Sequence, residues 1–182
     1  MRRTLQTTEQ SLGWLMERGV PAVVRAEFQE TTIKPCDVGS PISQISQEWP
    51  QFDWSEIDPV YPSKEGFYEY SQEALTKRGI AARRWLRDRP EKAIAVVSHA
   101  GFLRVGLCQK KFDNADFRVF DFEEGEEHGK FGPQLVEWEM TDSRGGGLGK
   151  SPKGAFGWEI NGFKTMPNKT PECTEPRSEE GA

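Results

Sequence analysis

One short stretch of the chain limits its fold more than any other. Residues 93–97 read A-I-A-V-V, an uninterrupted apolar run with three β-branched residues, and S-H-A-G follows at 98–101. A strand that is apolar on both faces is typical of a parallel sheet covered by helices. Gly101 allows a tight turn, and residues 101–108 return to a helical pattern. The sequence therefore predicts a buried strand and a helix, with His99 in the turn between them.

The segments on either side of this turn predict an α/β fold. Apolar residues recur at helical spacing over residues 4–19 and over residues 66–88. A short strand is predicted at 21–24, and alternating patterns at 117–122 and 134–140 predict the two strands of a hairpin. Helices and strands in this mixture are typical of the α/β class.

A proline-rich segment, residues 31–62, interrupts these patterns. It carries five prolines and has no clear helical or strand period. A loop of this length within a compact domain is usually a lid or a binding insertion. Trp49, Phe52 and Trp54 indicate that the segment packs on the rest of the molecule.

The length of 182 residues fits one domain with an appendage. We predict an α/β domain over residues 1–140, with the proline-rich segment as an insertion. Residues 141–182 are rich in Gly, Pro, Lys, Glu and Thr, a composition typical of a loosely ordered tail.

Composition and charge argue against several classes of protein. The net charge is −5 and the pI is near 5.3, which disfavours a general nucleic-acid or membrane-surface role. No apolar run approaches the ~20 residues that span a bilayer, and no apolar core follows the basic residues at the start of the chain, as it would in a signal peptide. The cysteines, Cys36, Cys108 and Cys173, are few and odd in number, which predicts free thiols and a cytoplasmic protein.

His99 is the first candidate for a functional residue. In open α/β sheets, ligands bind beyond the carboxyl ends of the strands, where His99 is predicted to lie. The helix that follows presents unpaired N–H groups and the positive end of its dipole, which favour an anion. An imidazole there can donate a hydrogen bond to phosphate or take up a proton. From the local pattern alone, a structural histidine that closes a strand explains the residue equally well.

The residues around His99 resemble a known motif. V-S-H-A-G-F-L-R at 97–104 is similar to the second-histidine motif, V-S-H-G-G-F-L, of the histidine phosphatase superfamily, the phosphoglycerate mutase-like proteins. R-R-T-L-Q-T-T at 2–8 resembles the family segment S-P-x-x-R-A-x-x-T-A, with Arg3 at the phosphate-binding arginine and Thr7 at the helix threonine.

Two more elements follow the family's order. F-Q-E at 28–30 resembles the L-x-E element whose glutamate is commonly the proton donor. N-A-D at 114–116 resembles the family's N-A-E or N-A-D turn. The resemblance covers roughly residues 1 to 140, and it implies a three-layer α/β/α sandwich of the phosphoglycerate mutase-like type.

The resemblance also implies roles for individual residues. In such enzymes a histidine attacks phosphorus and forms a phosphohistidine. His99 would be the second histidine, which donates to the phosphoryl group. Arg3 would hold phosphate oxygens bidentately, and Glu30 would protonate the leaving oxygen. Without the resemblance, Arg3 reads as a solvated charge and Glu30 as a surface acid. The implied substrate is a small phosphomonoester, with no cofactor.

One part of the family pattern has no counterpart here. The family's nucleophile lies in an R-H-G motif at the end of a first strand, ahead of the arginine helix, and no R-H-G occurs in this sequence. The sequence has one other histidine, His128. It follows Glu126 and Glu127, whose negative charges make this a poor place to bind a dianionic phosphate. We therefore expect an N-terminally truncated form of the fold. Loss of an interior strand would expose apolar flanks and favour a homo-oligomer.

Three classes of function remain open at this stage. The first is phosphatase-type phosphoryl transfer through a phosphohistidine whose nucleophile this chain does not supply. The second is a non-catalytic protein that keeps a phosphate pocket around Arg3 and His99. The third is a phosphoglycerate mutase-like protein of a biosynthetic pathway with another reaction. The sequence leaves open whether this chain alone is an enzyme.

Two other kinds of site are disfavoured. R-G-G-G-L-G-K-S at 144–151 nearly matches a phosphate-binding P-loop, but Arg144 replaces its first glycine and Pro152 breaks the helix that should follow. We interpret this stretch as a flexible connector. No set of Cys, His and carboxylate residues has metal-ligand spacing, so no metal site is predicted.

Overall fold

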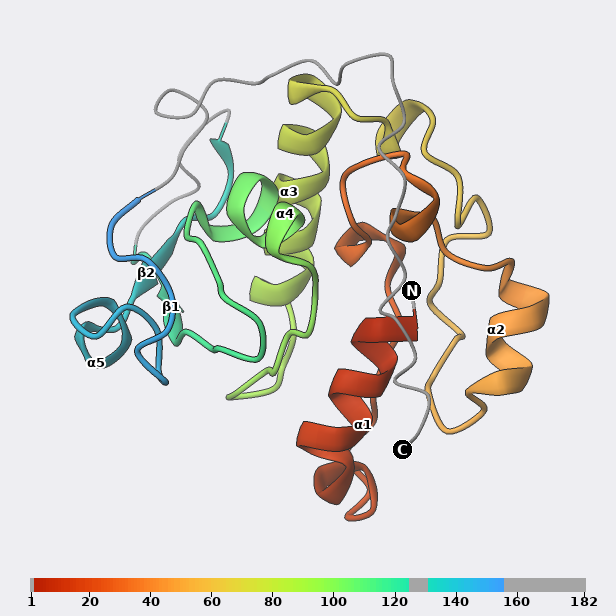
Figure 1. Ribbon diagram of the computed structural model, residues 1–182, viewed down its shortest axis with the longest axis horizontal. Helices are drawn as coiled ribbons and strands as arrows, with labels where there is room; N and C mark the ends of the chain where they lie inside the picture. Colours follow the sequence, from red (N-terminus) through yellow and green to blue (C-terminus); the bar gives the residue numbers. More distant parts are fainter. Residues whose placement is uncertain (1, 125–130, 156–182) are drawn as a thin grey trace, which may run out of the picture.

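The computed structural model describes residues 2–124 and 131–155. Helix α3 runs through the middle of the molecule with α4 against it; β1, β2 and α5 lie on one side, and α1 and α2 on the other (Figure 1). The helices and strands are α1 Arg2–Met16, α2 Ile42–Glu48, α3 Gln72–Arg87, α4 Ala100–Phe102, β1 Phe120–Phe122, β2 Leu135–Glu137 and α5 Glu139–Asp142. Three 3₁₀ turns, η1 Ala26–Phe28, η2 Pro35–Asp37 and η3 Gly66–Tyr68, and a π-helical turn, η4 Leu103–Cys108, complete the described elements.

The prediction of a buried strand over residues 93–97 is wrong. This stretch belongs to no strand, its first three residues are exposed, and Ile94 keeps 40% of its surface open to solvent. A strand needs a neighbour to pair with its backbone, and no described strand lies beside these residues. The other predicted strand in the first half, 21–24, is reduced to one parallel bridge between Val23 and Asp53.

The proline-rich segment packs on α1, as its aromatic residues predict. Leu5 of α1 forms a buried cluster with Ile45 and Phe52, and Trp49 and Trp54 pack around it. Each large apolar side chain buried in this way stabilises the fold by roughly 2 kcal/mol. The segment also contains a helix, α2, that the sequence pattern does not reveal.

Helix α3 forms the centre of the second apolar cluster. Ser71 caps it by accepting a hydrogen bond from the amide of Ala74, as serine does at helix starts. Its inner face packs on Phe102 and Leu107 of the helical turn that follows His99. The buried side chains of α3 are Ala74, Leu75, Arg78, Ala82, Arg83 and Leu86.

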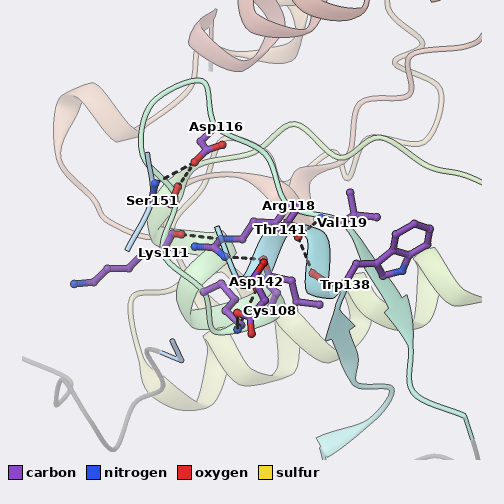
Figure 2. A network of polar contacts seen from close by, with 12 residues as sticks. Cys108, Lys111, Asp116, Arg118, Val119, Trp138, Thr141, Asp142 and Ser151 are labelled. Carbon is purple, nitrogen blue, oxygen red and sulfur yellow. Dashed lines mark hydrogen bonds and ion pairs between the residues drawn. The ribbon is translucent and has the colours of Figure 1, made fainter. Parts of the chain in front are cut away.

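The predicted hairpin is confirmed. β1 and β2 pair antiparallel, with Phe120 opposite Glu137. Beside the hairpin, the guanidinium of Arg118 forms an ion pair with the carboxylate of Glu137 at 2.6 Å, and both side chains are almost fully buried. Arg118 also donates to the main-chain oxygens of Lys111 and Pro152, so it connects β2 to the end of the described chain (Figure 2).

The glycine-rich stretch 144–151 folds around a carboxylate. Asp116 accepts hydrogen bonds from the amides of Phe117 (2.8 Å) and Leu148 (2.9 Å). It also accepts from the amide (3.1 Å) and the hydroxyl (2.6 Å) of Ser151 (Figure 2). A Cβ at Gly146 would overlap the carboxylate, so glycine is required there. The amides that resemble a phosphate-binding loop are thus occupied by a side chain of the protein.

Asp116 belongs to the N-A-D turn at 114–116, which the structure confirms as a turn. Partial burial alone would raise the pKa of Asp116, but the hydrogen bonds from Ser151, Leu148 and Phe117 outweigh it and lower the pKa to about 2. The predicted division into a domain over 1–140 and a tail over 141–182 stays a prediction. Ser151 and Pro152, which belong to that tail, form hydrogen bonds with Asp116 and Arg118 of the domain.

We expect Asp116→Asn to lower the free energy of unfolding by about 2 kcal/mol, because one oxygen of the acceptor becomes an amide that faces amide donors. The loss should appear at neutral pH in urea denaturation and shrink as the pH falls toward 2, where the wild-type carboxylate is protonated too. Asp113→Asn, three residues away and exposed, is the control. Equal stability of the two variants at neutral pH would contradict the role of the carboxylate.

Candidate functional site

Two distant parts of the chain meet at the start of α4. The hydroxyl of Ser98 donates to the main-chain oxygen of Phe28 at 2.8 Å. The ring of Phe28 packs edge-on against Phe102, with centroids 6.0 Å apart, and against Trp85 of α3 at 6.2 Å. These contacts lay residues 28–31 alongside the turn that carries His99.

Glu30 is seated directly on this turn. Its Oε1 accepts from the amide of Thr31 at 2.8 Å and from the Thr31 hydroxyl at 3.3 Å. The same oxygen fills the space that a side chain on Gly101 would occupy. Glu30 and His99, which the sequence separates widely, therefore lie at the same helix start.

His99 is buried, with 7% of its surface exposed, and immediately precedes α4. Burial, together with the nearby positive charges of Arg3 and Lys64, lowers the pKa of His99 to about 3, while Asp37 acts in the opposite direction. The imidazole is therefore neutral at physiological pH and offers one N–H donor and one acceptor nitrogen.

Arg3, at the start of α1, lies close enough to His99 to affect its pKa. Its guanidinium donates to the main-chain oxygen of Cys36 at 3.3 Å and lies 3.4 Å from the carboxylate of Asp37. More than half of its side chain is exposed, so much of its charge faces solvent. The structure thus brings the three predicted site residues, Arg3, Glu30 and His99, to one region; His128 lies outside the described residues.

The structure adds two cations that the sequence patterns do not single out. The ammonium of Lys64 donates to the main-chain oxygen of Glu30 at 2.5 Å, and Arg78 of α3 donates to that of Gln29 at 3.1 Å. Burial, together with the charge of Arg78, lowers the pKa of Lys64 to about 8. The sequence could have indicated Arg78, because a charged residue on the apolar face of a helix is unusual. No sequence pattern indicates Lys64, which lies in a loop.

A cavity of about 190 Å³ adjoins Arg3 on the outer side of the site. It is smaller than typical drug-sized pockets and of a size for a compact anion. Arg2 and Arg3 bring two guanidinium groups to its wall; Arg2 forms an ion pair with Glu48 at 2.6 Å, and Arg3 lies 3.4 Å from Asp37. Its lining residues are Arg2, Arg3, Cys36, Val38, Gly39 and Ser40.

In the part of the chain that the structure describes, no cluster of three His, Cys, Asp or Glu side chains could hold a metal ion. Cys36 and Cys108 form no disulfide within the described ranges, and Cys173 lies outside them. Within the same described ranges, no helix has the length and apolar character needed to cross a membrane.

Comparison with known proteins defines the class. Residues 1–126 match the histidine phosphatase superfamily (branch 1), and the chain belongs to this family. The match confirms the family resemblance of the sequence motifs and implies an α/β fold of the phosphoglycerate mutase-like type.

Two curated relatives are similar to parts of this chain. A probable phosphatase of Schizosaccharomyces pombe is 28% identical over 120 residues, which cover 64% of this chain and 56% of the relative. Phosphoglycerate mutase-like protein 2 of Arabidopsis thaliana is 33% identical over 111 residues, which cover 52% of this chain and 32% of the relative. The matched region therefore spans about half of the first relative and a third of the second. No solved structure gives a significant match.

We expect Gly101→Ala to displace the carboxylate of Glu30 and to lower the free energy of unfolding by about 1 to 3 kcal/mol, because the new methyl group overlaps Oε1. Urea denaturation measures the change. Gly13→Ala is the matched control: it lies inside α1 with open space around it, and it should stabilise the protein by about 0.5 to 1 kcal/mol. A neutral or stabilising effect of Gly101→Ala would contradict the position of the Glu30 carboxylate against Gly101.

The low pKa of His99 predicts a pH dependence of stability. Between about pH 3 and 6.5 the unfolded chain binds a proton at this position that the folded protein does not, so stability falls as the pH is lowered through this range. His99→Gln should flatten the decline by up to about 1.4 kcal/mol per pH unit. Urea denaturation at a series of pH values compares the two slopes. Identical slopes would show that His99 titrates normally in the folded protein.

Proposed function

We propose that this protein acts on small phosphomonoesters by phosphoryl transfer, with Arg3, His99 and Glu30 in its phosphate site. The observation that supports this most directly is that Glu30 meets the turn of His99 at the start of α4, with Arg3, from a third part of the chain, close enough to lower the pKa of His99. Arg3 and Lys64 lie close enough to shift the titration of His99, so the site is rich in positive charge. Such a site favours a dianionic phosphate.

The three residues divide the work by their chemistry. Arg3 supplies a guanidinium that stays protonated and matches phosphate oxygens. His99, neutral and buried, donates a hydrogen bond to a phosphoryl oxygen, and a bound dianion favours its protonated form. Glu30 protonates the leaving oxygen. We favour hydrolysis over mutase chemistry, in line with the probable phosphatase among the relatives.

We further propose that the phosphohistidine of this family forms on a histidine outside these 182 residues. No R-H-G motif occurs in the sequence. The full fold would then be a three-layer α/β/α sandwich in which another strand pairs with residues 93–97. The apolar, partly exposed state of that stretch, with Ile94 open to solvent, supports the idea. A second copy of the chain pairing there would produce the predicted homo-oligomer.

The absence of R-H-G also favours a second candidate. Without a nucleophile, the same arrangement binds phosphate or an anionic ligand and performs no reaction. The two candidates share the phosphate site and differ only in turnover.

We expect Arg3→Gln and His99→Ala each to weaken binding of inorganic phosphate by about 10- to 100-fold, because each removes a charged or buried hydrogen bond to the anion. Isothermal titration with phosphate and thermal stabilisation by vanadate measure the change. Arg18→Gln, an exposed arginine beyond the end of α1, is the control.

Hydrolysis of p-nitrophenyl phosphate, assayed on the same variants, separates the candidates. Release of phosphate by the wild type and its loss in His99→Ala support the enzyme. Tight phosphate binding without release supports the binding protein. Unchanged phosphate affinity in both site variants would contradict the proposed site.

A further inference from the structure

Arg78 is a charged side chain with none of its surface exposed. It lies on the inner face of α3, with its guanidinium 4.4 Å from the ring centroid of Phe102. One nitrogen, Nη2, donates to the main-chain oxygen of Gln29, while the buried Nε and Nη1 have no hydrogen-bond partner among the described residues. Burying a charge is costly unless the structure uses it, so this position needs an explanation.

The charged groups that face Arg78 show which residues its positive charge interacts with. Burial lowers the pKa of Arg78 to about 10, and the carboxylates of Glu30 and Glu27 and the hydroxyl of Tyr68 oppose that shift. Arg78 therefore stays protonated at neutral pH, and Glu30 is the first of the negative groups that stabilise its charge. The buried cation and the proposed proton donor are electrostatic partners.

Lys64 reaches the same short stretch from the other side. Its ammonium donates to the main-chain oxygen of Glu30, directly after the carbonyl that Arg78 holds. The main-chain oxygen of Ser63, next to Lys64, lies 3.5 Å from the side-chain amide of Gln29. Two consecutive carbonyls are thus each held by a cationic side chain, one from α3 and one from the loop that follows the proline-rich segment.

We propose that Arg78 and Lys64 are positioning residues that hold Glu30 in place for proton transfer. They do not touch the phosphate. They fix the peptide units on which the Glu30 carboxylate is carried, while Thr31 and Gly101 define where the carboxylate rests. This inference rests on the proposed role of Glu30 as proton donor.

Loss of this positioning should slow only the hydrolysis of substrates with poor leaving groups. An alkoxide needs a proton as it departs, whereas a dinitrophenolate departs without one, so a misplaced acid slows only the first. Placement matters because displacement of a catalytic group by about 1 Å can lower the rate by roughly 100-fold. A variant that only loosened the core would slow both substrates alike.

The test compares Arg78→Met and Lys64→Met with the wild type. The first readout is the ratio of kcat/KM for an alkyl phosphate to that for 2,4-dinitrophenyl phosphate, which we expect to fall about tenfold or more. The second is amide hydrogen exchange at Thr31, whose N–H donates to Glu30; we expect it to quicken about tenfold. Arg78→Lys should keep the kcat/KM ratio and the exchange rate at Thr31 close to those of the wild type, since Arg78 makes a single hydrogen bond that an ammonium can replace.

Arg83→Met is the matched control. Arg83 is also buried on α3, but it donates to the carbonyls of Gly106 and Pro133, away from Glu30. It should lower stability without changing the substrate ratio or the relative exchange at Thr31. In the Glu30→Gln background, Arg78→Met should cause no further fall in the ratio, because Arg78 acts through Glu30.

Several outcomes would overturn the inference. Both residues would be purely structural if Arg78→Met and Lys64→Met lowered kcat/KM equally for the two esters. Amide exchange at Thr31 would then quicken no more than exchange in α1 does. An additive loss with Glu30→Gln would show that Arg78 acts elsewhere. If the wild type hydrolyses neither ester, these 182 residues do not turn over substrate without the proposed outside histidine, and exchange at Thr31, which needs no turnover, decides whether the two cations hold Glu30.

Discussion

The packing of residues 28–31 against the turn at 98–102 is the contact on which the site depends. A hydroxyl-to-carbonyl hydrogen bond from Ser98 and the edge-on packing of Phe28 with Phe102 and Trp85 hold the two segments together. His99 lies buried at this contact, and its burial is the main cause of its low pKa. One piece of apolar packing therefore sets both the geometry of the site and the protonation state of its histidine.

Charge is distributed unevenly around this contact. Three cations, Arg3, Lys64 and Arg78, act on this part of the molecule, and the carboxylates of Glu30, Glu27 and Asp37 oppose their charge. Like charges held close together in a partly buried site raise its free energy, and a bound dianion relieves that cost. The proposed function uses this cost as affinity for phosphate.

The second half of the described chain shows how a carboxylate can occupy a site that looks built for phosphate. The glycine-rich stretch directs several amides at one point, as a phosphate-binding loop does, and Asp116 fills that point. Together with the buried pair of Arg118 and Glu137, it joins the stretch to the hairpin (Figure 2). These residues stabilise the fold, and the stretch predicted as a flexible connector donates several hydrogen bonds to Asp116.

The sequence by itself determined the helices α1 and α3, the hairpin, the family, and the three residues that the structure brings together, because helical periodicity and short motifs are local properties. It misassigned residues 93–97, since an apolar run reveals a tendency to form a strand but not the neighbour that must pair with it. It passed over Lys64 and Arg78, since a cation acquires its role from the carbonyls it meets far along the chain. Only the tertiary structure decided that the stretch ending at His99 is unpaired, and that Arg78 and Lys64 donate to the main-chain oxygens of Gln29 and Glu30 beside it.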